Sequence, residues 1–360
     1  MKSKILTVLA MLVVISVLAA CAPAAPAAAP AAAPAAAPAE VAATEAAPAE
    51  AAAGAVQIPV IIKATDSDFW QYVWVGAKNY ELENPGKVQV TLYGPKSEAD
   101  IDKQIAILED VIAKNPACIV MASTSSDAPV AAIENAVAAG TKFVMIDNKV
   151  NTDKVNTFLA TDNLKGGALA AEKMVEALTA RGVELKGKVA LISAMAGVQV
   201  LVNRDQGFTE KMKELAPDVE VLETKYTDND IVKALGIAQD LMAANPDMIG
   251  IFADNNHTGD GAARAIIEAN AQDKIVGVAF DSDPEEVQAI KDGVLVALIL
   301  QDPFGMGYKG VESCLKAIAG EELPAYVDTG AVAVTKENMD AEDVKGLLDP
   351  FSKKVEGASY

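Results

Sequence analysis

Two hydrophobic patterns alternate along most of this 360-residue chain. Short, nearly continuous apolar runs recur from Ile58 onward, and such runs are typical of strands buried on both faces of a parallel sheet. We predict strands over residues 59–64, 88–92, 118–122, 143–146, 188–192, 220–223, 248–253, 274–280 and 294–300. Amphipathic segments lie between the strands and predict helices over residues 100–114, 129–139, 167–181, 229–244 and 259–270.

The alternation of strand and helix predicts an α/β fold with parallel sheets and right-handed crossovers. About 300 residues carry this pattern, which is enough chain for two domains with hydrophobic cores. Nine or ten strand–helix units are too many for one small doubly wound sheet. The count alone therefore leaves two architectures open, namely two doubly wound lobes or a single eight-stranded β/α barrel.

The first 55 residues have a different character. Two lysines precede an apolar run over residues 5–20, which is too short for a membrane span and has the charged start of a secretory signal. The tetrapeptide Leu-Ala-Ala-Cys at residues 18–21 resembles the bacterial lipobox, whose cysteine is acylated and becomes the first residue after cleavage. We predict a lipoprotein signal peptide over residues 1–20 and lipid attachment at Cys21; an ordinary secretory signal is the alternative.

Residues 21–55 consist almost entirely of Ala and Pro, with three interspersed Glu. This composition has too few large apolar side chains to form a core, so we predict an extended, lipid-anchored linker. A proline-rich chain that rises about 3.1 Å per residue would reach roughly 100 Å from the membrane. The expected location is therefore extracytoplasmic, with the chain anchored to the cell membrane by its N-terminal lipid.

Charge and composition exclude several classes of protein. With 30 Lys and Arg against 50 Asp and Glu, the chain carries a net charge of −20, which would repel nucleic acid. The first 55 residues contribute −1, so −19 belongs to the folded part. One histidine and three cysteines are too few for a zinc cluster or a disulfide-rich scaffold. We expect no metal, and we expect Cys118 and Cys314 to be free buried thiols, although a disulfide between them stays open.

Polar side chains follow nearly every predicted strand at its carboxyl end. They occupy residues 65–68, 123–127, 147–148, 162–163, 254–256, 281–283 and 301–302. In open α/β sheets this edge is where ligands bind, although the same residue types also cap helices. We favour helix capping for Ser125, Ser126, Asp127 and Asp283. We favour ligand binding for Asp147, Asn255, Asp281 and Gln301, because acid and amide groups recur there at equivalent strand ends.

Seven short segments in order resemble the type I periplasmic sugar-binding proteins, the group that contains the ribose-binding protein. They are residues 63–70, 143–148, 160–163, 203–208, 252–256, 278–281 and 300–303. The resemblance implies two doubly wound parallel-sheet lobes joined by a three-segment hinge, which favours two lobes over a barrel. It divides the chain into an N-terminal lobe of residues 57–161 plus 302–328 and a C-terminal lobe of residues 162–301 plus 329–360.

The resemblance also implies a set of ligand-binding residues in the cleft between the lobes. They are Lys63, Asp66, Ser67, Phe69, Trp70, Asp147, Asn148, Arg204, Asn229, Asn255, Asp281 and Gln301. The chain departs from the ribose binders at Asn148, where they carry Arg, and around Asn229, where a third stacking aromatic is missing. Lys63 follows the first strand as in some relatives of the autoinducer-2-binding type. These departures leave the identity of the sugar open.

The chemistry of these residue types suits a carbohydrate. Vicinal hydroxyls donate to carboxylates and accept from Arg and amides, and charged partners make such bonds shorter and stronger. Phe69 and Trp70 offer an apolar platform to the C–H face of a ring. Two alternatives remain, since Phe69 can belong to the core and Arg204 can pair with Asp205. Trp74, one helical turn after Trp70, is expected in the core.

These expectations favour a solute-binding lipoprotein of an ABC importer. It would bind a monosaccharide or a similar small polyhydroxylated ligand in the cleft and deliver it to the permease by hinge closure. The first alternative is a sensor of the same fold that signals to a receptor, as for a sugar or an autoinducer-2-like ligand. A hydrolase with paired carboxylates and a DNA-binding repressor are both disfavoured. We expect a monomer that is not an enzyme.

A glycine motif, G-x-G-x-x-G at residues 305–310, is the one feature that suggests a nucleotide cofactor. Such a site needs a following strand with an acidic residue, and only 50 residues remain after Gly310. We therefore attribute these glycines to close packing beside the hinge and expect no cofactor.

Overall fold

The computed structural model describes residues 54–360. The expected signal peptide, the lipid-attachment residue Cys21 and nearly all of the linker lie outside the described residues. Within residues 54–360, no helix has both the length and the apolar character that a membrane crossing requires.

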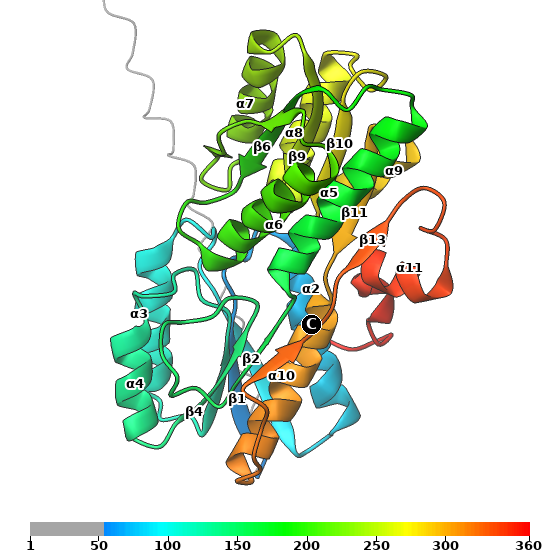
Figure 1. The fold of residues 1–360 in the computed structure, drawn as a ribbon. Helices are drawn as coiled ribbons and strands as arrows, with labels where there is room; N and C mark the ends of the chain where they lie inside the picture. Colours follow the sequence, from blue (N-terminus) through cyan, green and yellow to red (C-terminus); the bar gives the residue numbers. More distant parts are fainter. Residues whose placement is uncertain (1–53) are drawn as a thin grey trace, which may run out of the picture. The chain divides into compact units, whose positions relative to one another are not determined.

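The first lobe is built on a six-stranded parallel sheet with the order β12-β5-β4-β3-β1-β2. Its strands are β1 (Val56–Ile61), β2 (Val88–Tyr93), β3 (Cys118–Met121), β4 (Lys142–Ile146), β5 (Thr157–Ala160) and β12 (Tyr326–Asp328). Strands β1, β2 and β4 of this sheet are labelled in Figure 1. Helices α2 (Asp68–Glu83) and α10 (Pro303–Ile318) cover one face, and α3 (Ile101–Ile112) and α4 (Val130–Ala138) cover the other. Successive residues of β1 show why its apolar run is continuous, because Val60 packs toward α2 and Ile61 toward α3.

The second lobe is built on a seven-stranded sheet with the order β13-β11-β10-β9-β6-β7, and β8 pairs with β6. Its strands are β6 (Gly187–Ser193), β7 (Val219–Val221), β8 (Lys225–Tyr226), β9 (Met248–Ala253), β10 (Val276–Phe280), β11 (Leu295–Leu300) and β13 (Val332–Val334), of which β13 is antiparallel. Helices α5 (Asn163–Ala180) and α6 (Gln199–Leu215) cover one face. Helices α7 (Ile231–Ala244), α8 (Asn256–Glu268), α9 (Pro284–Lys291) and α11 (Glu342–Leu348) cover the other.

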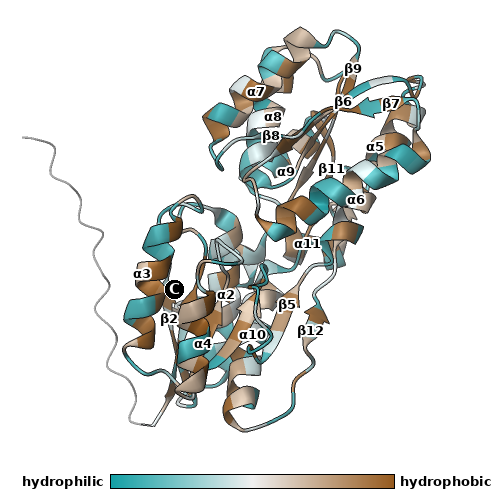
Figure 2. Ribbon diagram, turned by 60° about the vertical axis from the view of Figure 1, so that its left-hand side comes forward, coloured by the Kyte–Doolittle hydropathy of each residue, from teal (hydrophilic) through white to brown (hydrophobic). Residues whose placement is uncertain are grey.

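Two parallel-sheet lobes are therefore present, as expected, and the single barrel is excluded. The strands inside the second lobe are hydrophobic and are brown in Figure 2. The covering helices α5 and α6 also carry hydrophilic segments, which are teal. The chain passes between the sheets after β5, after β11 and after β12. The carboxyl ends of the parallel strands thus lead into the crossings, where polar side chains of both lobes meet.

The end of the chain departs from the expected division into lobes. Residues 329–360 were expected with the second lobe, and α11 does pack into its core through Val344 and Leu348. The following 3₁₀ helix η1 (Pro350–Lys353) instead packs on α2 of the first lobe. The ring of Phe351 lies 4.8 Å from that of Tyr72, and Tyr360 Oη donates to Asn79. Residues 350–360 return to the first lobe because α2 offers them an aromatic and amide surface.

Close helix packing explains the glycine motif. A Cβ at Gly307 of α10 would lie 1.9 Å from Val73 O on α2, and one at Gly76 would lie 1.9 Å from Phe304 O. The two helices therefore touch backbone to backbone, which only glycine permits at these positions. This contact holds the α2 helix, which begins directly beside the cleft.

A disulfide joins Cys118 of β3 to Cys314 of α10, with a Cα–Cα distance of 5.7 Å. The expectation of free thiols is wrong. The bridge connects residues 196 positions apart and ties the returning α10 segment to the centre of the first sheet. Disulfides persist in oxidising compartments, so this one agrees with an extracytoplasmic location.

Candidate functional site

A cleft lies where the carboxyl ends of strands from both sheets approach one another. The space between its atoms amounts to about 330 Å³, part of which is open to solvent. The cleft is lined by Lys63, Phe69, Trp70, Glu98, Asp147, Val200, Leu201, Arg204, Asn255, Asn256, Asp281 and Gln301. Eight of the twelve candidate residues named from the sequence are in this wall, contributed by both lobes, and their roles toward a ligand remain predictions.

The first-lobe wall centres on a buried ion pair. Lys63 follows β1 and Asp147 follows β4, and Lys63 Nζ lies 2.5 Å from Asp147 Oδ2. Asp147 has a φ of 59°, in the left-handed region that Asp and Asn tolerate better than other side chains. The ion pair compensates the cost of burying both charges and presents one compact polar unit to the cleft.

Phe69 and Trp70 open α2 and form the aromatic part of this wall. Their rings meet edge to face with centroids 4.8 Å apart, and both also belong to the first-lobe core. Trp70 Nε1 donates to Glu98 Oε1 at 2.7 Å, and Lys63 Nζ lies 5.4 Å from the centre of the Trp70 ring. Only 2% of Trp70 is exposed, so most of the indole packs in the protein and little of it is open to solvent.

In the second lobe, Arg204 of α6 is fixed by three contacts. Its Nε donates to Asn163 Oδ1 at 2.8 Å, its Nη1 donates to Asp254 O at 2.7 Å, and its guanidinium stacks 4.0 Å from the Phe280 ring centre. Gly167 on α5 makes this placement possible, because a Cβ there would lie 2.0 Å from Arg204 O. The guanidinium is therefore rigid and oriented before any ligand arrives.

Asp281, at the end of β10, is the buried acid that this guanidinium approaches. Arg204 Nη1 lies 3.8 Å from Asp281 Oδ2, so the ion pair of Arg204 is with Asp281 and not with Asp205. Burial raises the pKa of Asp281 to about 6, opposed by Arg204 and by the hydrogen bond from Gln301, and the carboxylates of Asp147 and Glu98 raise it further. Like Asp147, Asp281 has a positive φ, of 73°.

Gln301 and Asn255 complete the polar wall in different ways. Gln301 Nε2 donates to Asp281 Oδ1 at 2.6 Å, whereas its buried Oε1 has no hydrogen-bond partner among the described residues. A buried amide oxygen without a partner is costly and is well suited to accept a hydrogen bond from a ligand. Asn255 caps α8 by accepting from Thr258 N at 3.0 Å and donates to Asn229 at 2.7 Å.

Four of the candidate residues lie outside the cleft wall. Asp66 is exposed, and Ser67 is buried against Asn256 Nδ2 of the second lobe at 3.4 Å. Asn148 donates to Ser126 Oγ at 3.4 Å, because successive residues at a strand end point to opposite sides. Asn229 is 6% exposed, and its Oδ1 accepts a hydrogen bond from Asn255 Nδ2.

Four residues of the wall were not among the candidates. Glu98 lies in the loop between β2 and α3, five residues after the strand ends, so the strand-end pattern did not mark it. Asn256 adjoins the candidate Asn255 and begins α8. Val200 and Leu201 are in the first turn of α6 and add apolar surface, a contribution for which the sequence carries no separate signal.

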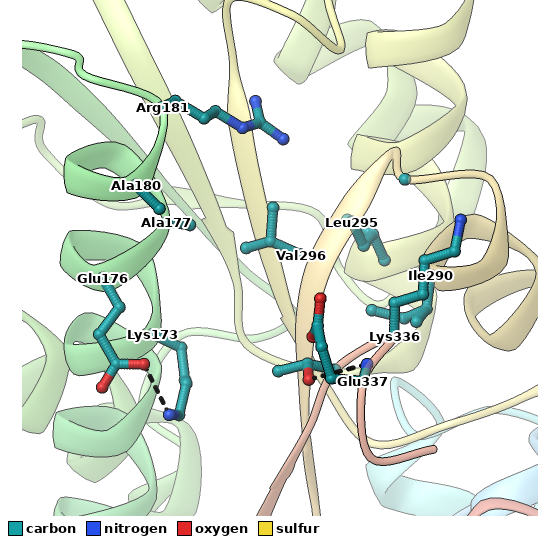
Figure 3. A pocket seen from close by; sticks show the side chains of 12 residues that line it. Lys173, Glu176, Ala177, Ala180, Arg181, Ile290, Leu295, Val296, Lys336 and Glu337 are labelled. Carbon is teal, nitrogen blue, oxygen red and sulfur yellow. Dashed lines mark hydrogen bonds and ion pairs between the residues drawn. The ribbon is translucent and has the colours of Figure 1, made fainter. Parts of the chain in front are cut away.

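A larger hollow lies on the second lobe between α5, α9 and β11, away from these residues (Figure 3). It has about 840 Å³ of empty space that is partly open to solvent. Its charged groups are already engaged, since Lys173 pairs with Glu176 at 2.7 Å and Arg181 Nη1 donates to Gln272 O at 2.8 Å. The inter-lobe cleft is the better candidate because its buried polar groups converge and one of them lacks a partner.

Comparisons with known proteins show which proteins the chain resembles. The family model of the periplasmic binding protein domain matches residues 58–322. A carbohydrate transporter solute-binding protein from Agrobacterium radiobacter, crystallised in complex with D-arabinose, is 36% identical with a TM-score of 0.79; the match covers 82% of this chain and 99% of that one.

The names of two further relatives mention a sugar. An ABC transporter solute-binding protein from Agrobacterium vitis with bound D-fucose is 33% identical with a TM-score of 0.77, covering 81% of this chain and 100% of that one. The ribose import binding protein of Escherichia coli K12 is 29% identical over 282 residues, which are 78% of this chain and 90% of that protein.

Proposed function

This chain belongs to the family of type I periplasmic sugar-binding proteins, and we propose that it binds a monosaccharide or a similar small polyhydroxylated ligand in the inter-lobe cleft for an ABC importer. The relatives are binding proteins of transport systems, and the chain is accordingly a binding protein and not an enzyme. Family members work outside the cytoplasm, which agrees with the disulfide of the first lobe. Lipid anchoring through Cys21 is part of this proposal.

One observation carries the proposal: buried charged groups of both lobes line the same cleft. Asp147 stands on the first lobe, and Arg204 and Asp281 stand on the second. Each carboxylate accepts hydroxyl hydrogens and the guanidinium donates to hydroxyl oxygens, in charge-assisted bonds worth about 1.5–3 kcal/mol each. A ring that carries several hydroxyls can form hydrogen bonds with both sides at once, whereas an apolar ligand would offer none to these buried groups.

The same arrangement supports delivery by hinge closure. A ligand that bridges the lobes makes its full set of bonds only when the cleft is closed, so it shifts the balance toward the closed form. A shift from 1:99 to 99:1 needs about 5.5 kcal/mol of differential affinity, which a few charge-assisted bonds supply. The closed form is then the state that the permease subunits recognise, and the unaltered sugar is released there.

A thermal-shift screen of the full chain tests this function. The panel comprises D-arabinose, D-fucose, D-ribose and D-allose, together with glucuronate and ribose 5-phosphate as acidic comparators. A ligand at 100 times its Kd should stabilise the fold by about 2.7 kcal/mol, and the recovered sugar should be unchanged. Chemical turnover of a sugar, or the absence of any stabilising neutral sugar, would contradict the proposal.

A further inference from the structure

Glu98 is the wall residue whose charge has no counterpart. It follows β2, its Oε1 accepts from Trp70 Nε1 at 2.7 Å, and its side chain lines the cleft. Its second oxygen, Oε2, has no hydrogen bond within residues 54–360. One end of this carboxylate is therefore fixed on the indole, while the other is available to a group in the cleft.

The charges of the cleft wall do not balance. Two cations and three carboxylates line it. Lys63 is taken by Asp147 at 2.5 Å, and Arg204 lies 3.8 Å from Asp281. In the described part of the chain, Glu98 has no cation within 4.0 Å. The wall therefore has an excess of one negative charge, and this charge is on Glu98.

This excess has opposite consequences for two classes of ligand. A neutral sugar can donate a hydroxyl to Glu98 Oε2 and gain a charge-assisted bond. A sugar acid or a sugar phosphate would bring another anion next to three carboxylates, and each of the two cations already lies beside one of them. Glu98 is half-buried, and rejection by an unpaired like charge in a cleft wall is a source of specificity.

We propose that Glu98 is a specificity-determining residue of the cleft: it accepts a hydroxyl hydrogen of a neutral sugar and excludes acidic sugars. This inference rests on the proposed function and names its substrate class. Glu98 also positions Trp70 through the indole hydrogen bond, so the test separates its charge from its support of the ring.

Matched variants make this separation. Glu98→Gln keeps the side-chain volume and an oxygen that can accept from Trp70, and removes only the charge. Glu98→Asp keeps the charge and shortens its reach. Trp70→Phe removes the indole donor and keeps Glu98, while Glu109→Gln removes an exposed carboxylate of α3 and serves as the control. The melting temperature of each ligand-free variant establishes that it is folded.

Calorimetric titration measures the Kd for the best neutral sugar of the screen and for the uronate of the same ring. We expect Glu98→Gln to raise the Kd for the neutral sugar by about 10- to 100-fold. The ratio of the two Kd values, which measures discrimination against the uronate, should fall by at least about 10-fold. Glu98→Asp should lower the affinity for the neutral sugar and keep the discrimination against the uronate. Trp70→Phe should also keep it, and Glu109→Gln should match the wild type.

The outcomes separate this inference from the proposed function. If the wild-type chain binds no sugar of either class, the proposed function fails and the role of Glu98 fails with it. If the wild type binds a neutral sugar but Glu98→Gln changes neither affinity nor discrimination, only the role of Glu98 is overturned. A wild type that prefers the uronate also overturns the role of Glu98. The same holds if Glu98→Asp is folded and binds the uronate as tightly as Glu98→Gln does.

Discussion

Lys63 Nζ lies 2.5 Å from Asp147 Oδ2, and the two side chains are only 3% and 4% exposed. Removing one partner leaves a buried, uncompensated charge. We expect Lys63→Met to lower the free energy of unfolding by about 3–5 kcal/mol. Urea unfolding followed by circular dichroism measures this change. The double variant Lys63→Met with Asp147→Leu should recover part of the loss, because neither charge remains.

An exposed pair provides the control for this result. Lys165 pairs with Asp162 at 2.7 Å, but the lysine side chain is 77% exposed. Lys165→Met should leave the free energy of unfolding nearly unchanged, because water already solvates both charges. If Lys63→Met proved as mild as Lys165→Met, the Lys63–Asp147 pair would not be the buried unit described above.

Ligand affinity should depend on pH through Asp281, whose pKa burial raises to about 6. The groups that face it are Arg204, Gln301, Asp147, Glu98, Asp254 and Glu286. Ligand hydroxyls donate to the ionised carboxylate, so binding favours the deprotonated form and lowers the pKa of Asp281 further. We therefore expect affinity to fall as the pH drops from 7 through about 6 toward 5, as calorimetric titration at each pH would show.

The variant that tests this assignment is Asp281→Asn. Asn tolerates the positive φ of 73° better than Ala does, so the fold is preserved while the titrating group is lost. Affinity at pH 7 should fall by about 100-fold or more, and the remaining affinity should change much less between pH 5 and 7 than that of the wild type. A variant that keeps the full pH dependence would show that another group causes it.

The stability of the ligand-free protein should respond to pH in the opposite direction. Burial raises the pKa of Asp254 and of Asp281 to about 6, and that of Asp205 and of Asp260 to about 8. The folded chain thus holds more protons than the unfolded chain between about pH 4 and pH 8, and stability falls as the pH rises through this window. The melting temperature should be higher at pH 5 than at pH 8.

Asp260→Asn isolates one contribution to this slope, because Asp260 is outside the cleft wall. Its removal should make the melting temperature less dependent on pH between 6 and 8 without altering ligand affinity. A melting temperature that rises steadily from pH 5 to pH 8 would contradict the raised pKa values of these buried acids.

The strand-end pattern located the cleft from sequence because parallel strands deliver their carboxyl ends to one edge. It could not decide which residue of each polar segment faces inward. Asp147 lines the cleft, while the next residue, Asn148, turns toward Ser126. The sequence pattern also did not predict contacts between distant segments, such as the ring contact of Phe351 with Tyr72 and the hydrogen bond from Trp70 to Glu98. Those depend on tertiary packing, which local pattern does not encode.

The disulfide between Cys118 and Cys314 should contribute strongly to stability. It closes a loop between residues 196 positions apart, and loops of this size gain the most from a cross-link in the chain-entropy account. We expect the variant with both cysteines changed to Ala to lose about 2–5 kcal/mol of unfolding free energy in urea. Dithiothreitol should produce a similar loss in the wild type and no further loss in the variant. Equal stability of reduced and oxidised wild type would contradict the prediction.

Two helical glycines should respond to the same substitution in opposite ways. A Cβ at Gly307 would lie 1.9 Å from Val73 O, so Gly307→Ala must push α10 away from α2. We expect it to lower the unfolding free energy by about 1–3 kcal/mol. Since α2 begins with Phe69 and Trp70 in the cleft wall, the displaced helix should also weaken ligand binding.

Gly236 of α7 has no atom within 4 Å of the position that a Cβ would take. Gly236→Ala should therefore stabilise the chain by about 0.5–1 kcal/mol, because the unfolded state loses conformational freedom and nothing in the fold is displaced. Urea unfolding and calorimetric titration of both variants give the comparison. If Gly307→Ala were as harmless as Gly236→Ala, the backbone contact between α2 and α10 would not be what places the aromatic wall, and the orientation of Phe69 and Trp70 would have to come from the first-lobe core alone.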